Sequence, residues 1–338
     1  MFGRFLLKRI GAAVLLAFGI VVVTFALTAL LPGDPATAQL GERAAADPEI
    51  VAAYMKANGL DQPLYTQFFI YLGHLVQGDL GTSLQSRNPV LTDLGQFGPA
   101  SFELAVTATV IAVIVGVGLG IVAALRPDRP LDHTLRVVSL GGVSIPIFWL
   151  SLIAVFIFST QLRIFPSSGR LNPGETPPPH ITGLYTLDSL LTANWATFGS
   201  AVGHLILPAL VLAAPMVGLL LRFTRSSMLE VIGNDYVRSA NAKGLPPGLV
   251  VRRHTLRGAL VPVITVLGSA FASLLAGTVL VEQIFAWPGI GSYAYRSASN
   301  LDLPAIVGVT LFVALVFIAV NFLVDVLYGL IDPRIRTS

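Results

Sequence analysis

Six long apolar runs constrain the fold of this chain more than any other feature of its sequence. An α-helix rises about 1.5 Å per residue, so about 20 apolar residues cross the hydrocarbon layer of a membrane. Only 12% of the residues are charged, against about 25% in soluble domains, and 54% are hydrophobic. We therefore expect an all-α polytopic membrane protein with six transmembrane helices. The runs are Ile10–Leu31, Leu104–Leu125, Val137–Leu162, Leu205–Leu221, Ala259–Val281 and Leu303–Val324.

The fourth run is the shortest, and it stops at Arg222. Because a basic side chain can reach the membrane interface from within a helix, we expect this helix to continue beyond Arg222 into the following loop.

The distribution of basic residues gives the orientation. Fifteen of the 21 Lys/Arg lie in the N-terminus, the Arg126–Arg136 loop, the loop after the fourth run and the C-terminus. Loops rich in Lys and Arg stay on the cytoplasmic side. Both termini are therefore expected in the cytoplasm. The basic residues lie beside membrane spans without interleaved aromatic residues, so nothing indicates nucleic-acid binding.

The sequence offers no catalytic, cofactor-binding or metal-binding residues. The chain has no cysteine, and its only lysines are Lys8, Lys56 and Lys243, none of which follows a phosphate-binding glycine pattern. His180 and His204 are isolated and lack the spacing of a metal site. We expect a chain that is not an enzyme on its own.

The most basic loop is Glu230–Pro262. Seven Lys/Arg and only two acids lie between Arg222 and Arg257. Asn234 is a favourable N-cap, and Gly244 is suited to end the helix that follows. A short helix is therefore expected between these two residues.

This short helix is expected to present a small apolar face formed by Tyr236, Val237 and Ala240. Leu245–Gly248 then reverses the chain, and Leu249–Leu260 resumes a helical pattern with a basic face. An element of this kind in a membrane protein indicates that another protein docks on it.

The order of residues in the loop is specific. It reads YVRSANAKGL from Tyr236 and RHTLRGALVPV from Arg253. This resembles the cytoplasmic coupling loop of ABC importer permeases, and most closely their dipeptide/oligopeptide/nickel branch, which reads roughly YVRTARAKGL and RHALRNALIPV. Arg238 replaces the Glu of the general importer pattern, as it does in the branch. Further runs that resemble the family are LLPGDP, GDLGTS, SIPIFWL, HLILPAL, WPGIG and the DPR near the C-terminus.

The resemblance implies the type I ABC importer transmembrane fold and a multi-pass location in a bacterial or archaeal plasma (inner) membrane. It implies a homologous second permease subunit, two ATP-binding subunits that hold ATP and Mg, and an extracytoplasmic substrate-binding protein; this chain itself would bind no cofactor. The residues it assigns to coupling with an ATP-binding subunit are Asp235, Tyr236, Val237, Arg238, Ala240, Lys243, Gly244 and Leu245.

We divide the chain into four parts. Residues 1–33 form an N-terminal transmembrane helix, and 34–98 form an extracytoplasmic segment with amphipathic helices. Residues 99–330 form the core of five helices, with the coupling loop at 226–258, and 331–338 form a cytoplasmic tail.

Several residues within the spans are of interest for the transport pathway or for a kink. Pro146, with Ser144 nearby, is expected to kink the third helix, either for structural reasons or to shape the pathway. Gly268, Ser269 and Ser273 place small residues on the fifth helix, facing a neighbour or a pore. A second pair, Gly116 and Gly120, is expected to allow close approach of another helix.

The outer segments and the last helix carry further expectations. The segment Arg163–His204 is rich in Pro and Gly and is expected to be loop. Asp325 is expected near the cytoplasmic surface, paired with a loop arginine. Aromatic residues near the outer ends of the spans form two groups. Those of the last outer turn are expected at the lipid headgroups, and those of one amphipathic helix are expected either on the membrane or packed against the protein itself. They are Trp287, Tyr293 and Tyr295 in the last outer turn, and Tyr65, Phe68 and Phe69, with Leu72, on one helical face.

The function expected from the resemblance is ATP-driven import of peptides, with this chain forming half of the pathway. Nickel chelates, glutathione-like molecules and opines are alternative cargoes within the same family. An ion-coupled secondary transporter would need inverted repeats and ionisable groups near the membrane midplane, and an intramembrane enzyme would need a catalytic constellation. The sequence shows none of these features.

Overall fold

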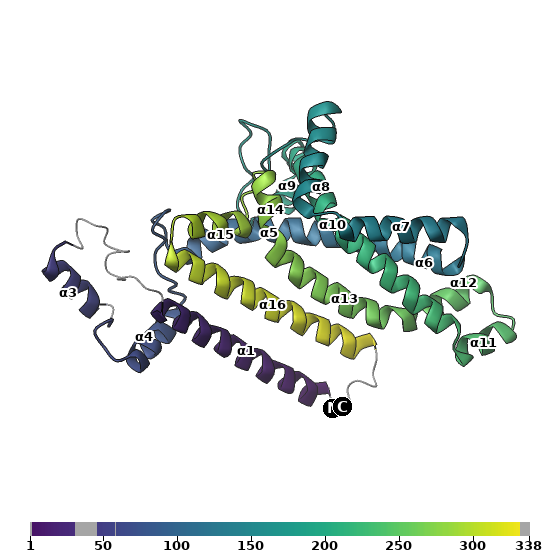
Figure 1. Ribbon diagram of the computed structural model, residues 1–338, viewed down its shortest axis with the longest axis horizontal. Helices are drawn as coiled ribbons and strands as arrows, with labels where there is room; N and C mark the ends of the chain where they lie inside the picture. The colour runs from purple at the N-terminus through teal and green to yellow at the C-terminus, as the bar shows by residue number, and fades with distance from the viewer. Residues whose placement is uncertain (1, 31–45, 58, 332–338) are drawn as a thin grey trace. The chain divides into compact units, whose positions relative to one another are not determined.

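The computed structural model describes residues 2–30, 46–57 and 59–331, and the fold is mostly helical (Figure 1). Within these ranges the only β-structure is an isolated bridge between Thr82 and Pro89. The α-helices are α1 (Phe2–Leu30), α3 (Pro48–Ala57), α4 (Leu64–Val76), α5 (Val90–Ala112), α6 (Gly118–Leu125), α7 (Pro130–Ser144), α8 (Ile147–Ala154), α9 (Tyr185–Leu191), α10 (Trp195–Ile232), α11 (Asp235–Ala242), α12 (Pro247–Leu249), α13 (Leu256–Gly277), α14 (Val279–Ile284), α15 (Ile290–Ser299) and α16 (Leu303–Ile331). Three π-helical segments join some of them: η1 (Val113–Val117), η2 (Val155–Gln161) and η3 (Val250–Thr255).

Five helical stretches are long and apolar enough to cross a membrane, and a sixth forms if one bent pair counts as a single span. The bent pair is α7 with α8–η2. The number of spans therefore agrees with the six runs in the sequence. The five are Arg9–Ala26, Val90–Leu125, Trp195–Ile232, Pro247–Phe271 and Leu303–Val324.

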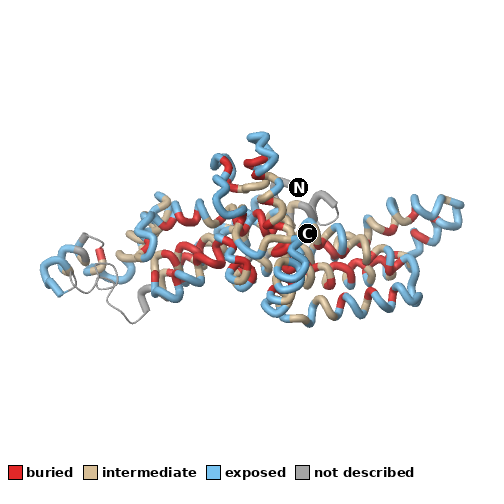
Figure 2. The backbone as a smooth tube through the Cα atoms, turned by 90° about the horizontal axis from the view of Figure 1, so that it is seen from above, coloured by how far each residue is buried: buried red, intermediate tan, exposed pale blue. Residues whose placement is uncertain are grey.

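The described chain divides into two compact units. Of the described residues, one unit contains 2–9, 97–293 and 319–331, and the other contains 10–30, 46–57, 59–96 and 294–318. Exposed residues occur along the long helices as well as at the turns (Figure 2). Large apolar side chains are among them, as expected where part of the solvent is lipid.

The first unit is built around α10, which has 38 residues. The helix begins after Asn194, whose Oδ1 atom accepts a hydrogen bond from the backbone N–H of Thr197 at 3.2 Å. It continues past Arg222 to Ile232, so the expected extension into the cytoplasmic loop is confirmed. The helix packs against α6, α7, α9 and α13.

Two glycines allow α10 to approach its neighbours closely. A Cβ atom on Gly116 would lie 2.9 Å from the Cβ of Leu220, and one on Gly120 would lie 2.6 Å from the Cβ of Thr224. Both distances are too short for carbon atoms, so only glycine fits. The expected role of this pair in helix packing is confirmed.

The third span is broken at Pro146. Helices α7 and α8–η2 meet at an angle of 102°. Pro146 lacks an N–H and disfavours a helical conformation in the preceding residue, Ile145, whose ψ is 125°. The sequence predicted a kink, and the structure has a much sharper break.

The outer segment Arg163–His204 is more ordered than expected. It contains α9 and the first turns of α10, so the prediction of loop alone is wrong. A buried ion pair fastens it to α5: Arg170 Nη2 lies 2.6 Å from Glu103 Oε2. The other oxygen of Glu103 accepts hydrogen bonds from the backbone N–H and the hydroxyl of Thr186 at 2.8 and 2.6 Å.

In the second unit, two buried carboxylates organise the loop that contains GDLGTS. Asp302 accepts a hydrogen bond from the Ser83 hydroxyl at 2.5 Å and also accepts the backbone N–H of Ala305 in the first turn of α16. Asp93, in the first turn of α5, accepts the Ser86 hydroxyl at 2.5 Å. The loop is therefore tied to the starts of two helices. LLPGDP falls largely within residues 31–45, and the DPR run lies after residue 331, so both are outside the described residues.

Candidate functional site

The short helix predicted in the basic loop is present as α11. It begins directly after Asn234, as expected, although among the described residues no first-turn N–H bonds to the Asn234 side chain. Asp235 and Arg238 form an ion pair one turn apart on the exposed surface of the helix. Because both side chains are exposed, this pair contributes little to stability.

Gly244 ends α11 in a left-handed conformation with φ of 75°. Its N–H donates to the carbonyl of Asn241 at 2.9 Å, and the N–H of Leu245 donates to the carbonyl of Ala240 at 3.4 Å. These two bonds form a Schellman motif, in which glycine is favoured because a side chain would be strained. The sequence prediction that Gly244 ends the helix is confirmed.

One face of α11 is buried. Val237 is 1% exposed and Ala240 is 5% exposed. Tyr236 does not share this face: it is 47% exposed, and its hydroxyl fills the space beside Gly258, where a Cβ atom would lie 2.8 Å away. The residues packed with Val237 and Ala240 are Ala124, Met228, Val231, Val250 and Ala259.

The other coupling residues named from the sequence lie toward solvent. Asp235, Arg238, Lys243 and Gly244 are exposed, and Leu245 is half-buried in the same apolar cluster. The helix therefore has a fixed inner face and an open, polar outer face.

The basic end of α10 is clamped to α7. Arg225 Nε lies 2.5 Å from Asp132 Oδ1, and Arg225 Nη2 lies 2.7 Å from Oδ2. The Asp132 side chain is fully buried. The sequence reasoning missed this pair and placed the partner of a loop arginine at Asp325, whose side chain lies outside those that the structure describes.

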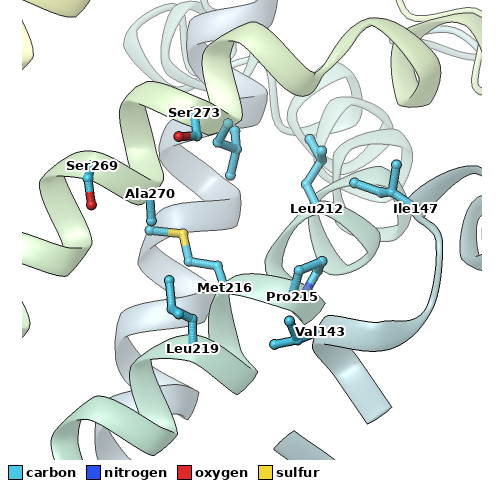
Figure 3. Close-up of a pocket in the computed structure, with 10 residues that line it drawn as sticks. Val143, Ile147, Leu212, Pro215, Met216, Leu219, Ser269, Ala270 and Ser273 are labelled. Carbon is cyan, nitrogen blue, oxygen red and sulfur yellow. The ribbon is translucent and has the colours of Figure 1, made fainter. Parts of the chain in front are cut away.

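An apolar cavity of about 450 Å³ lies where α7 breaks into α8, between α10 and α13 (Figure 3). Among its lining residues the only polar side chains are the hydroxyls of Ser269 and Ser273. The full lining is Val143, Ile147, Leu212, Pro215, Met216, Leu219, Ser269, Ala270, Ser273 and Leu274.

The structure separates the five residues considered for the pathway. Ser269 and Ser273 line the cavity. Ser144 and Pro146 form the break between the lining residues Val143 and Ile147 but do not line it. Gly268 is buried against α16, since a Cβ atom there would lie 2.4 Å from Val324 Cγ2. It therefore faces a neighbouring helix and not a pore.

A buried carboxylate supports the outer turn. Glu282 lies in α14, outside the five spans, and its oxygens accept the Ser101 hydroxyl at 2.5 Å and the Ser292 N–H at 2.7 Å. Burial raises the pKa of this carboxyl. A Cβ atom on Gly289 would lie 2.5 Å from the Glu282 carboxyl group, which explains the glycine in WPGIG.

The aromatic residues of this turn are placed differently from the prediction. Trp287 is 1% exposed, and its indole N–H donates to the carbonyl of Ala100 at 3.0 Å. Tyr293 is also buried, stacked on Phe97 with ring centroids 5.0 Å apart. Only Tyr295 is exposed, so the expected headgroup position is wrong for the other two.

Among the described residues there is no group of three or more His, Asp or Glu side chains that would hold a metal ion. His204 Nδ1 lies 2.8 Å from the carbonyl oxygen of Ser200, within its own helix. The described residues of this region thus combine a short helix with an exposed polar face, an ion-paired contact between α7 and α10, and an apolar cavity at the break after α7.

Comparison with known proteins agrees with this geometry. Residues 116–337 match the family described as binding-protein-dependent transport system inner membrane component, and residues 1–99 match its N-terminal counterpart. The probable D,D-dipeptide transport system permease protein of Escherichia coli strain K12 is 45% identical over 334 residues, 99% of this chain and 98% of that protein. The di/tripeptide transport system permease protein of Pseudomonas aeruginosa strain UCBPP-PA14 is 46% identical over 332 residues, 98% of each. A dipeptide transport system permease protein of Alkalihalophilus pseudofirmus is 39% identical over 330 residues, 98% of each.

The fold has a solved counterpart. The inward-facing MetNI methionine ABC transporter superposes with a TM-score of 0.50 at 14% sequence identity, over 70% of this chain and 96% of that one. The likeness supports the type I ABC importer transmembrane fold. The chain therefore belongs to the family of inner membrane components of binding-protein-dependent transport systems, as a multi-pass permease subunit without enzymatic activity of its own.

Proposed function

We propose that this permease subunit carries peptides inward across the plasma membrane. The support for this cargo is the near full-length similarity to relatives named for D,D-dipeptide, di/tripeptide and dipeptide transport. The cavity is consistent with such a cargo. Its wall is apolar with two hydroxyls, so it makes few specific contacts and can accept peptides with different side chains.

The observation that carries the mechanism is α11. Its Val237–Ala240 face is fixed on the protein, while Asp235, Arg238 and Lys243 are left open to a partner. We assign this outer face to docking on an ATP-binding subunit, in an assembly of two such subunits, a second permease and an extracytoplasmic binding protein. ATP and Mg would be held by the partner subunits, and this chain would bind no cofactor.

The transport cycle follows from differential contact. A partner that holds α11 differently in its ATP-bound and ATP-free states shifts the permease between two conformations by the difference in binding free energy. In this proposal α10 carries that movement to the cavity, where the break at Pro146 and the small side chains Ser269 and Ser273 border the path.

The test is uptake by proteoliposomes. The chain is co-expressed with its neighbouring subunits and reconstituted with ATP inside, and the binding protein and a mixed peptide pool are placed outside. Mass spectrometry of the vesicle contents should show ATP-dependent accumulation of peptides, absent when ADP replaces ATP. Active ATP hydrolysis without peptide uptake would overturn the cargo and direct the search to nickel chelates, glutathione or opines; uptake driven by an ion gradient without ATP would overturn the mechanism.

A further inference from the structure

Helix α4 packs on the first membrane span through an aromatic cluster. The ring centroid of Phe68 lies 6.1 Å from that of Phe18 and 5.3 Å from that of Phe25, both in α1. Tyr71 adds a contact with Phe25 at 5.7 Å. These four residues belong to the same compact unit. Phe68 and Tyr71 are three residues apart, so a single face of α4 is used for this contact.

The contact fixes the depth of α4. The span in α1 begins at Arg9 on the cytoplasmic side, given the orientation from basic residues. At about 1.5 Å per residue, Phe18 and Phe25 lie about 14 and 24 Å from that end of a hydrocarbon layer about 30 Å thick. The Phe68 ring therefore lies at the depth of the outer leaflet.

A second face of α4, beside the one that contacts α1, is apolar and largely exposed. Tyr65 is 69% exposed, Phe69 is 66% exposed and Val76 is 81% exposed. With the half-buried Leu72 they are spaced by four, three and four residues, which places them in one stripe along the helix. The sequence placed Phe68 on the same face as Tyr65, Phe69 and Leu72. In the structure Phe68 contacts α1, whereas the other three lie on this separate second face.

The charge pattern suits lipid rather than water. Residues 64–73 carry no charged side chain, while Asp61 precedes the helix and the His74–Asp79 pair, 3.1 Å apart, lies at its far end. The side-chain amide of Gln67 donates to the carbonyls of Leu60 and Gln62, so it needs no water. The neighbouring surface of α1 is equally apolar, with Leu15 71% exposed. Polar ends around an uncharged helix are typical of a segment lying in the plane of a membrane interface.

We propose that the stripe formed by Tyr65, Phe69, Leu72 and Val76 is a lipid-binding surface, in contact with the acyl chains of phospholipids in the outer leaflet. Through Phe68, this surface supports the outer half of α1. The occupant is lipid because the stripe lies at membrane depth, continues the apolar surface of a membrane span and carries no charge for a protein partner to pair with.

Because the chain has no cysteine, single-cysteine variants give a direct test. Phe69→Cys reports the stripe, and the adjacent Phe68→Cys is its matched control on the covered face. Leu15→Cys in α1 serves as a lipid reference, and Asp61→Cys as a water reference. Each assembled complex is labelled with a nitroxide and reconstituted in vesicles of phosphatidylethanolamine and phosphatidylglycerol. The signal of a complex with the unsubstituted chain, from any partner cysteines, is subtracted.

Two collision rates of the nitroxide are measured. One is with oxygen, which concentrates in lipid, and the other is with a nickel complex that stays in water. At Phe69→Cys, oxygen collision is expected to exceed nickel collision several-fold, as at Leu15→Cys, while Phe68→Cys is protected from both. Higher nickel than oxygen collision would show a water-facing surface open to the binding protein. Protection from both would show a protein partner on the stripe. Either result overturns the proposal, and Tyr65→Cys and Val76→Cys give the same reading if Phe69→Cys does not assemble.

Discussion

The ion pair between α7 and α10 gives a prediction whose magnitude follows from its geometry. The Asp132 side chain is 0% exposed and that of Arg225 is 17% exposed. The carboxylate accepts the two Arg225 donors, at 2.5 and 2.7 Å, and also the N–H of Asp128 at 3.1 Å and Arg136 Nη2 at 3.2 Å. Removal of Arg225 therefore leaves a buried charge with its two longer contacts only.

Breaking a buried ion pair by removing one partner costs about 3–5 kcal/mol, because the remaining charge is left uncompensated. For Arg225→Ala we expect a loss near the lower end, about 3 kcal/mol, since Arg136 stays close to Asp132. Asp132→Asn should cost less, about 1.5–3 kcal/mol for the weakened hydrogen bonds, because the partly exposed guanidinium can reach water.

The assay is thermal unfolding of the purified complex, together with peptide uptake per ATP hydrolysed. Arg136→Ala is the matched control: it removes an arginine from the same carboxylate, but its side chain is 41% exposed, so its loss should stay below about 1 kcal/mol. In the double variant Asp132→Asn/Arg225→Ala the loss should be smaller than the sum of the two single losses. Equal effects of Arg225→Ala and Arg136→Ala, or additive losses in the double variant, would refute the reasoning.

Three further predictions concern the coupling loop and the outer turn. Gly244→Val should uncouple ATP hydrolysis from uptake, with Gly244→Ala milder, because φ of 75° strains any side chain by about 1–2 kcal/mol although the space around it is open; normal transport per ATP in the valine variant would contradict this. Arg238→Glu should reduce co-purification of the ATP-binding subunits, whereas Arg129→Glu in the other cytoplasmic turn should not, and equal yields would count against docking on α11. Burial raises the pKa of Glu282 in the folded protein above that of an ordinary glutamate. The folded state therefore binds this proton more tightly than the unfolded state, which stabilises the fold below the ordinary glutamate pKa; this stabilisation is lost as pH rises through the raised pKa. Thermal unfolding of Glu282→Gln should therefore vary less with pH than that of the unsubstituted complex, and parallel profiles would exclude this contribution.

The elements that the sequence predicted well are those set by local chemistry. The end of α11 at Gly244 and the extension of α10 past Arg222 each depend on a few neighbouring residues. The small residues Gly116 and Gly120 predicted a close helix contact, but they did not predict that the contact is with α10. The break at Pro146 was predicted in place but not in size, because the angle also depends on how α8 packs.

What the sequence could not predict are pairs joined across long separations. Asp132 and Arg225 are 93 residues apart, and Ser83 and Asp302 are 219 apart. No local sequence pattern around an isolated aspartate such as Asp132 identifies its distant ion-pair partner. The error at Trp287 has a related cause: an aromatic residue near a membrane end is expected at the interface, but the carbonyl of Ala100 gives its N–H a partner inside the protein.

In the mechanism proposed above, the packing of α7 on α10 would pass a movement of α11 to the cavity. A Cβ atom on Gly218 would lie 2.5 Å from the carbonyl oxygen of Ser139, so the two backbones touch. Arg225 joins the same two helices nearer the cytoplasm, so the two contacts oppose sliding or rotation of one helix on the other. Helical hydrogen bonds are interrupted at prolines, which lie at Pro146 after α7 and at Pro208 and Pro215 within α10. Pro215 itself lines the cavity and Pro146 adjoins it, so a rigid displacement from α11 would be converted into bending at the cavity wall.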